Sequence, residues 1–204
     1  MDICYIVGTG SNWRNWELRY SLRSITKYGI NVDKVVIVGN IPHYVNQNEV
    51  ICIPCDDIDG PKHNRILHKI LTAVNSGKLS NDFLISSDDH FYVKPTDFNN
   101  LPVYYKNEVI KGGDKNSYHK SLSETKEFLQ QNGLTLYQTN PHCNTHFNIE
   151  VYNKYKDLFE AGTKLPNGIE SNCLMGNLLI KEGYKAEHYR DIKVKSLESL
   201  KLKL

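Results

Sequence analysis

The sequence of 204 residues has no long apolar run, no strong excess of charge of one sign and no even set of cysteines. No segment approaches the roughly 18 consecutive apolar residues that a membrane-spanning helix needs, so no membrane span is expected. The net charge of +2 is too small to indicate nucleic-acid binding. A lysine excess in the last segment, "IKVKSLESLKLKL", leaves a basic tail open beside the commoner case of a solvated terminal element. With 40% apolar and 24% charged residues, the composition is that of an ordinary globular protein.

The five cysteines are an odd number in apolar surroundings, which suits free thiols in a reducing cytoplasm. The opening segment "MDICYIVG" does not resemble a signal peptide, because it has an acidic second residue and a short apolar run. We therefore expect a cytoplasmic protein. Cys52 and Cys55 form a C-x-x-C pair, which is either two buried strand-end thiols or half of a zinc site. A zinc site would need two more ligands, for which His142 and Cys143 are candidates.

The first ninety residues alternate between short branched apolar runs and amphipathic segments. Strands are predicted over 3–8, 34–40, 49–55 and 83–93, and helices over 15–28 and 64–74. This β-α-β-β-α-β order predicts an α/β fold, in which helices flank a mostly parallel, Rossmann-like sheet. The length suggests one domain over 1–204.

The second half is less regular and predicts a smaller, mainly helical part. Helices are predicted over 117–133, 151–159 and 170–181, and strands over 134–140 and 191–196. No internal repeat and no low-complexity linker interrupts the chain.

Two adjacent carboxylates end the apolar segment "FLISSDDHFYV" and have no lysine or arginine beside them. Burying ionised carboxylates is costly unless they are paired or bound to a cation. In an extended strand, Asp88 and His90 would point to one side while Asp89 points away. Carboxylate with imidazole suits Mn²⁺, and carboxylates alone suit Mg²⁺. The alternative is a capped strand end with exposed acids.

Three polar segments stand at the ends of predicted strands and are expected to meet beyond the carboxyl ends of the sheet. They are "GTGSNW", "PCDD" and "SDDH". Open α/β sheets bind their ligands at that edge. The acid pair is therefore expected at a binding site.

Four segments resemble, in this order, characteristic regions of the Stealth family, which includes bacterial capsular polysaccharide phosphotransferases. They are "WELRYSLRSITKYG", "KVVIVGNIPHYV", "LHKIL" and "LSNDFLISSDDHFYVKPTDF". The resemblance continues loosely at "NTHFNIEVYNKYKDLF" and "GIESNCLMGNLL". The core of that family is similar to a GT-A glycosyltransferase fold. The resemblance therefore implies a GT-A-like domain, with a nucleotide-sugar-binding half over 1–98 and an acceptor-side half over 99–204.

The resemblance also implies roles for single residues. Asp88, Asp89 and His90 match the motif that binds a divalent cation and a nucleotide diphosphate, His146 a functional histidine, and Glu170 an acidic residue. His146 is then a third metal ligand or a group at the reacting centre. The family's arginine before Glu170 is not matched, since "KLPNGIES" stands there. Asp89, His146 and Glu170 are the candidate catalytic residues.

Candidate nucleotide-sugar-binding residues follow from position in the predicted elements. A glycine loop after the first strand lets backbone approach a nucleotide, although an ordinary turn is nearly as common. Polar side chains four residues apart share a face of the first helix, where an arginine would clamp phosphate or pair with Asp56 or Asp57. The second helix begins with polar residues at an end that favours anions. The residues are Gly8, Thr9, Gly10, Asn15, Arg19, Arg23, His63, Asn64 and Arg65.

Glu170 has two interpretations on the residues alone. It is either a general base that takes the proton of an acceptor hydroxyl or a first-turn residue favoured by the helix dipole.

The expected function is transfer of a sugar from a nucleotide-diphosphate sugar to an acceptor hydroxyl, with Mn²⁺ or Mg²⁺ as cofactor. The alternatives are a Stealth-type sugar-1-phosphate transferase and a non-catalytic nucleotide-sugar-binding module. Candidate acceptors are a glycan, a lipid-linked sugar and a hydroxymethylated DNA base. The abundance of Asn and Lys fits an AT-rich bacterial or phage genome, hence a bacterial or phage-infected cell.

Overall fold

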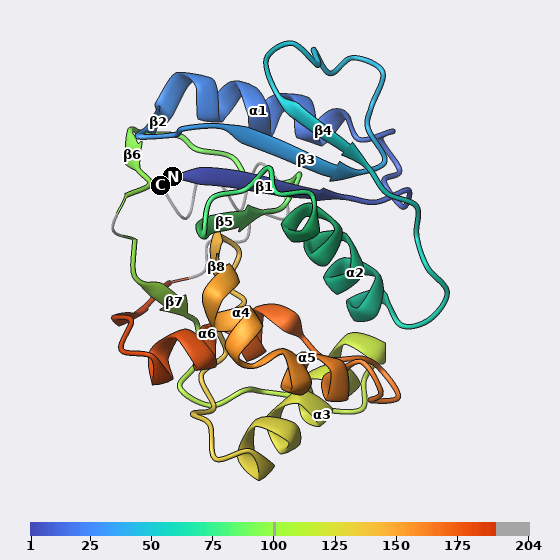
Figure 1. Ribbon diagram of the computed structural model, residues 1–204, viewed down its shortest axis with the longest axis vertical. Coiled ribbons are helices and arrows are strands. Elements are labelled where there is room, and N and C mark those ends of the chain that lie inside the picture. The colour runs from blue at the N-terminus through green and yellow to red at the C-terminus, as the bar shows by residue number, and fades with distance from the viewer. Residues whose placement is uncertain (100, 191–204) are drawn as a thin grey trace.

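The computed structural model describes residues 1–99 and 101–190. Its centre is a five-stranded sheet with the order β4-β3-β1-β5-β8 (Figure 1). The strands are β1 (Asp2–Val7), β3 (Val35–Gly39), β4 (Ile51–Pro54), β5 (Asp82–Ser86) and β8 (Thr145–Asn148). The first four are parallel, and β8 pairs antiparallel with β5. This confirms the α/β fold with a mostly parallel sheet flanked by helices.

Helices cover both faces of the sheet because successive strand residues point to opposite sides. On one face, α1 (Trp16–Tyr28) buries Leu18 and Ile25 in the same cluster as Ile3 and Leu84. On the other face, α2 (Lys62–Asn75) packs in a cluster with Phe83 and other strand residues.

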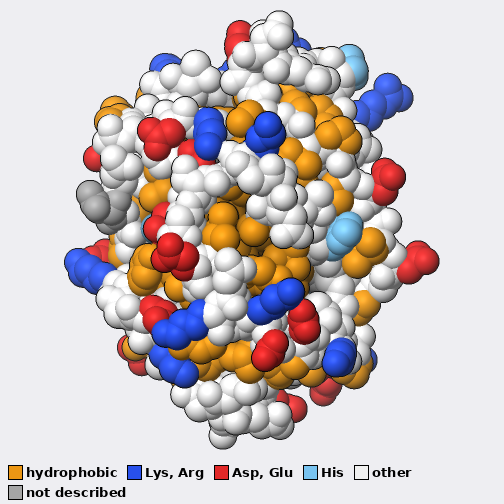
Figure 2. Space-filling view, in the orientation of Figure 1, with side chains coloured by type: hydrophobic (Ala, Val, Ile, Leu, Met, Phe, Trp, Pro, Cys, Tyr) orange, Lys and Arg blue, Asp and Glu red, His pale blue; other side chains and the backbone are white. Residues whose placement is uncertain are grey.

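The helices of the second half extend the α2 side of the molecule, as Figure 1 shows below the sheet. They are α3 (Ser117–Gln131), α4 (Ile149–Lys154), α5 (Lys156–Gly162) and α6 (Ser171–Lys181). Two short parallel pairs complete the fold: β2 (Gly29–Ile30) with β6 (Thr96–Asp97), and β7 (Val103–Tyr105) with β9 (Ala186–His188). Charged side chains of both signs are interspersed on the face seen in Figure 2, in keeping with the small net charge.

Several boundaries differ from the sequence-based predictions. The predicted strand over 134–140 is wrong: outside an isolated bridge at Gln138, this segment forms no strand. The reason is the buried side chain of Asn177, which accepts from Tyr137 N at 3.0 Å and donates to Tyr137 O at 2.8 Å. These are the backbone groups that a neighbouring strand would use.

The remaining differences concern strand and helix ends. The strand predicted over 83–93 ends at Ser86, and the helix predicted over 151–159 is divided between α4 and α5. Strand β8 was not predicted. The strand predicted over 191–196 lies outside the described residues. In the described part of the chain, no helix combines the length and the hydropathy needed to cross a membrane.

Candidate functional site

Loops with polar side chains gather at the carboxyl edge of the parallel strands. Because β1, β3, β4 and β5 run in the same direction, the segments that begin at Gly8, Asn40, Cys55 and Ser87 leave the sheet at one edge. In Figure 1 the strand arrows point to this edge, on the right. The predicted convergence of the three polar segments is therefore present.

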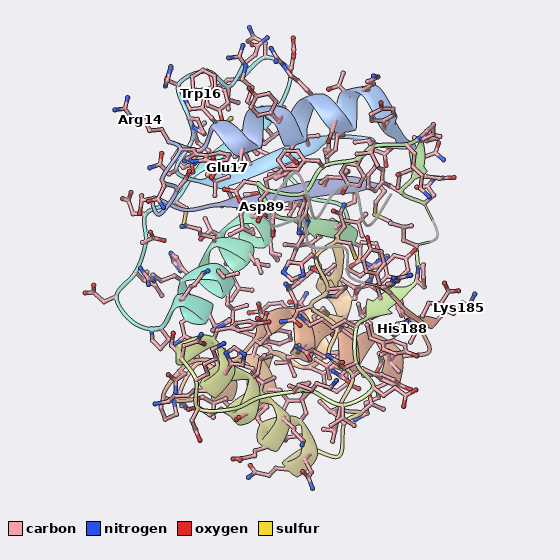
Figure 3. All side chains as sticks on the ribbon, turned by 180° about the vertical axis from the view of Figure 1, so that it is seen from behind. Arg14, Trp16, Glu17, Asp89, Lys185 and His188 are labelled. Atoms are coloured by element: carbon pink, nitrogen blue, oxygen red, sulfur yellow. The ribbon has the colours of Figure 1, made fainter. Side chains whose placement is uncertain are left out.

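Three carboxylates, from α1 and from the segment after β5, form one part of this edge, which we name the acidic cluster: Glu17, Asp88 and Asp89. Figure 3 labels Glu17 and Asp89. Burial, followed by the charges of Asp89 and Glu17, raises the pKa of Asp88 to about 6. One carboxylate oxygen of Glu17 accepts from Ser11 Oγ at 2.5 Å, and the other is buried without a hydrogen-bond partner. The largest electrostatic influences on Asp88 are therefore like charges, which favour its protonated form.

The donor set of the acidic cluster fits a divalent cation only with help from a ligand. Among residues 1–99 and 101–190, no group of three or more His, Cys, Asp or Glu side chains is placed to hold an ion alone. Mg²⁺ commonly takes one or two protein carboxylates and completes its octahedron with phosphate oxygens and water. Asp88 and Asp89 meet that requirement, and the unpaired oxygen of Glu17 adds a further acceptor nearby.

The segment after β5 forms a turn, so the alternation expected for an extended Asp-x-His strand is wrong. His90 N donates to Ser87 O at 3.2 Å, and Ser87 N lies 3.5 Å from His90 Nδ1. The imidazole is folded back on its own turn. Of the two adjacent carboxylates, Asp89 is exposed and Asp88 is half-buried.

A buried polar network beneath the acidic cluster fixes this turn. Tyr5 OH lies 2.7 Å from Ser21 Oγ, and Ser21 Oγ donates to His90 O. Tyr92 N donates to Ser24 Oγ at 3.0 Å, and Tyr92 OH donates to the side chain of Asn144. The loop that presents the acid pair is thus held by α1 and by the segment before β8.

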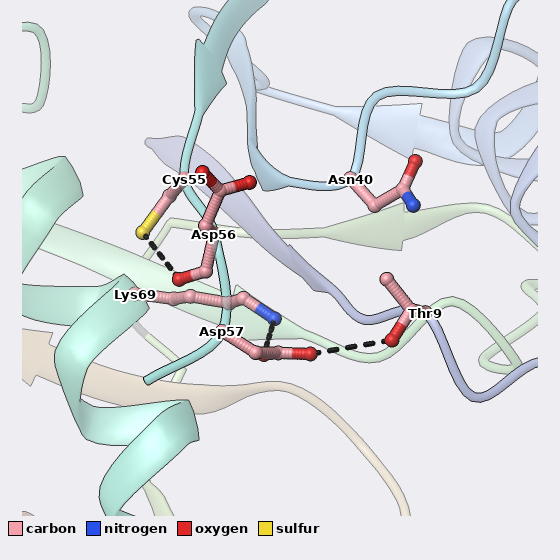
Figure 4. A pocket seen from close by; sticks show the side chains of 6 residues that line it. All are labelled: Thr9, Asn40, Cys55, Asp56, Asp57 and Lys69. Carbon is pink, nitrogen blue, oxygen red and sulfur yellow. Dashed lines mark hydrogen bonds and ion pairs between the residues drawn. The ribbon is translucent and has the colours of Figure 1, made fainter. Parts of the chain in front are cut away.

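A second part of the edge, which we name the lysine pocket, is a hollow of about 340 Å³ (Figure 4). It is lined by Thr9, Asn40, Cys55, Asp56, Asp57 and Lys69. The side chain of Lys69 is 5% exposed, and its Nζ lies 2.5 Å from Asp57 Oδ1. Asp57 Oδ2 accepts from Thr9 Oγ1 at 3.3 Å. The hydrogen bond from Lys69 holds the pKa of the Asp57 carboxyl below its usual value.

Lys69 was not predicted as a site residue. A lysine between apolar positions of an otherwise amphipathic helix, four residues after Arg65, was the available signal. Gly39 gives it room, because a Cβ there would lie 3.1 Å from Lys69 Cε and 2.0 Å from Val7 O. A Cβ on Gly8 would lie 4.0 Å from Nζ, an ordinary contact, so the approach of this backbone to a nucleotide stays a prediction.

A second hollow of about 290 Å³ shares Thr9 and Asn40 with the lysine pocket. Asn15 lines it in a left-handed conformation, with φ of 59°, and is 93% buried. Its Nδ2 donates to Gly8 O at 3.4 Å, while its Oδ1 has no hydrogen-bond partner. Gly10 has no atom near the position of an added Cβ, so its backbone is accessible.

Arg19 and Arg23 do not line either hollow. The guanidinium of Arg19 lies over the ring of Trp16, 5.0 Å from its centroid, and Arg23 is exposed. Of the two predicted acidic partners, Asp57 pairs with Lys69 instead.

Two predicted residues from different halves come together at the junction of α2 and α6. His63 Nδ1 lies 3.3 Å from Glu170 Oε2, and both residues are buried. Glu170 is the N-cap of α6, one residue before the predicted first turn, and accepts from Asn172 N at 3.4 Å. Asn64 also links the halves, because its Nδ2 donates to Thr163 O at 2.8 Å. Arg65 has a buried Nε without a hydrogen-bond partner, and its charge acts on Asp57.

His146 lies in β8 and pairs with Leu84 of the neighbouring strand β5. Leu84 precedes Asp88 by four residues in the chain. Burial lowers its pKa, and its Nε2 is buried without a hydrogen-bond partner. The structure therefore places this imidazole in the sheet rather than in the loop with the acid pair.

The zinc alternative is contradicted by the topology. Cys52 lies in β4 and Cys55 follows it, and β4 is one outer strand of the sheet. His142 and Cys143 precede β8, the outer strand on the opposite side. With strands spaced about 4.8 Å apart, the two pairs are separated by roughly 19 Å.

No protein-family model matches the chain, and a search of curated proteins finds no match either.

Proposed function

We propose that this protein is a metal-dependent glycosyltransferase that moves a sugar from a nucleotide-diphosphate sugar to an acceptor hydroxyl. The observation that carries the proposal is the acidic cluster, in which partial burial and the charges of Asp89 and Glu17 raise the pKa of Asp88 to about 6. A divalent cation supplies the positive charge that these carboxylates lack. The GT-A-like assignment of the sheet belongs to the same proposal.

Asp88 and Asp89 are the residues that hold the cation in this proposal. When bound, such a cation neutralises the diphosphate and stabilises it as a leaving group. The carboxyl edge supports this assignment, because the acid pair and the glycine loop from Gly8 to Gly10 leave neighbouring strands there.

The hydrogen bonds below the acid pair serve the same function by fixing its geometry. Ser21 and Asn144 hold the turn from two different elements, so the carboxylates need little reorganisation when a ligand arrives. The acceptor oxygen then forms a bond to the anomeric carbon as the bond to the diphosphate oxygen breaks. Glu170 is the candidate base from the sequence, and its deprotonation of the acceptor would require release from His63.

The test is a thermal-shift screen of nucleotide sugars with and without Mn²⁺, because a ligand that binds only the folded protein raises the unfolding midpoint. We expect a shift that needs both donor and cation and that is lost in Asp89→Asn. Asp59→Asn, at an exposed acid outside the acidic cluster, is the matched control.

Product analysis of the active donor then defines the reaction. Release of the nucleoside diphosphate indicates glycosyl transfer, and release of the monophosphate indicates sugar-1-phosphate transfer. A cation-dependent shift without any turnover indicates a binding module. The proposal is contradicted if no donor shifts the midpoint in Mn²⁺.

A further inference from the structure

We infer that the lysine pocket is a phosphate-binding site and that the Asp57 carboxylate occupies the position of the ligand's phosphate. The inference rests on the proposed function only for the class of the ligand, a nucleoside diphosphate. It concerns a different set of side chains from the acidic cluster and requires no cation.

The first observation is the placement of the lysine charge. Lys69 is 96% buried, and its ammonium lies at the ends of β1 and β3, beside Gly8 and Gly39. A buried ammonium requires a negative partner, since removing it from water is costly without one. Asp57 supplies that partner from a different segment, the connection between β4 and α2.

The second observation is the set of donors that Asp57 contacts. One carboxylate oxygen faces the Lys69 ammonium and the other faces the Thr9 hydroxyl. A phosphate oxygen accepts hydrogen bonds from the same two kinds of donor. The carboxylate therefore satisfies groups that a phosphate would also satisfy.

The third observation is that Asp57 belongs to an exposed connection between β4 and α2. All residues from 56 to 60 are exposed, and none lies in a helix or strand. Gly60 follows with φ of 119°, a backbone conformation that other residues rarely adopt. Displacement of this segment from Lys69 would therefore break no strand pairing of the sheet.

The fourth observation is the space and charge next to the ion pair. The hollow of about 340 Å³ shares the lining residues Thr9 and Asn40 with the second hollow of about 290 Å³. Arg65 acts electrostatically on Asp57 from the first turn of α2. When Asp57 leaves, the positive charges of Lys69 and Arg65 lose the carboxylate on which both act. Figure 4 shows the Asp56 carboxylate turned away from the Lys69 ammonium.

Ligand binding would then exchange one anion for another on Lys69. The phosphate displaces the Asp57 carboxylate, which moves into water with its charge intact, and no covalent bond changes. Asp57 thus stabilises the ligand-free protein and competes with the ligand for the same cation.

The experiment measures binding of inorganic pyrophosphate by calorimetry in the presence of EDTA, with no divalent cation. We expect Asp57→Asn to bind pyrophosphate at least tenfold more tightly than the natural sequence, because the competing anion is removed. Asp56→Asn is the matched control, since it removes an equal charge from the same pocket but no contact with Lys69. It is expected to change the affinity less than threefold. Lys69→Gln in the Asp57→Asn background should abolish the gain.

Unchanged or weaker binding in Asp57→Asn overturns the inference, because the carboxylate is then no competitor of the ligand. An equal gain in Asp56→Asn also overturns it, since the effect is then one of net charge. If Asp57→Asn does not fold, hydrogen exchange of the natural protein gives the answer. Pyrophosphate should speed the exchange of amides 56–60, and slower exchange there contradicts displacement.

The two proposals fail separately. If Asp57→Asn binds pyrophosphate more tightly but no donor binds in a cation-dependent way, the phosphate site is supported and the transferase proposal is contradicted. If donor binding depends on Mn²⁺ and Asp89 but Asp57→Asn gains no affinity, the transferase proposal is supported and the phosphate site is contradicted.

Discussion

The acidic cluster and the lysine pocket lie at the same edge of the sheet, yet they differ in the sign of the charges that lie side by side. In the lysine pocket, a buried ammonium has a carboxylate 2.5 Å away, and the pKa of that carboxyl is lowered. In the acidic cluster, Asp88 has two like charges as neighbours, and its pKa rises to about 6.

This difference indicates which charges the fold balances by itself. An ion pair within the chain stabilises the ligand-free protein, whereas uncompensated like charges destabilise it until a proton or a cation arrives. The lysine pocket is therefore complete without a ligand, and the acidic cluster is not. Substitutions on the two sides should consequently change stability with opposite signs.

The largest expected effect is on turnover through the acidic cluster. Asp89→Asn should lower the rate of sugar transfer at least 100-fold, about 3 kcal/mol of transition-state stabilisation, because one of two proposed cation ligands is lost. Asp59→Asn should keep the natural rate. The check is a coupled assay for the nucleoside diphosphate at saturating donor and Mn²⁺. A rate within threefold of the natural one would separate the acidic cluster from the chemistry.

The next effect is a loss of stability in the lysine pocket. Asp57→Asn should lower the free energy of unfolding by about 2 kcal/mol at pH 7, less than a fully buried pair, because Asp57 is partly exposed. Since the folded pKa of Asp57 is lowered, its contribution is present above the unfolded pKa near 3.8 and is lost as the pH falls through the folded value. Urea denaturation at pH 7 is the measurement. The control, Asp56→Asn, should differ by less than 0.5 kcal/mol, roughly the range for surface substitutions.

A gain in stability is expected on the opposite side. Asp88→Asn should raise the free energy of unfolding by about 1.5 kcal/mol at pH 7.5. This is about half of the free energy that corresponds to a pKa shift from 3.8 to about 6, because solvent screens the charge of a half-buried group. The folded protein holds the Asp88 proton more tightly than the unfolded chain. Its stability therefore falls as the pH rises from about 4 to about 6.

The same denaturation series at pH 3.5 and 7.5 checks that gain, which should vanish at the lower pH. Mn²⁺ with a bound donor should also reduce it, since the cation replaces the proton. A destabilising Asp88→Asn at pH 7.5 would mean that the acidic cluster is balanced after all.

The smallest expected effect concerns the support of the acidic cluster. Tyr92→Phe removes the hydroxyl that donates to Asn144 and should lower the free energy of unfolding by about 1 kcal/mol. Tyr20→Phe, at an exposed position of α1, is the control and should be neutral. Thermal unfolding of the three proteins is sufficient. Equal stability of Tyr92→Phe and the natural sequence would show that the other contacts alone hold the turn.

Local patterns were enough to predict most of the first half. The apolar runs that became β1, β3 and β4 are short and branched, and the spacing of Leu18 and Ile25 defined the buried stripe of α1. These signals depend on residues within one or two turns of each other, so the sequence carries them directly. The start of β5 was predicted in the same way, but its end was placed at residue 93 rather than at Ser86, ahead of Asp88 and Asp89.

Partners across the fold were decided only by the tertiary structure. Glu17 reaches the acid pair because α1 lies over β5, and Lys69 meets Asp57 because the loop after β4 returns to α2. The four residues of β8 form a strand because they pair with the outer side of β5. Residues 134–140 form no strand because the Asn177 side chain bonds to the backbone of Tyr137. The sequence determined which segments become helices and strands and where acids follow a strand. The structure decided which charges meet, because that depends on contacts between residues far apart in the chain, which no local pattern encodes.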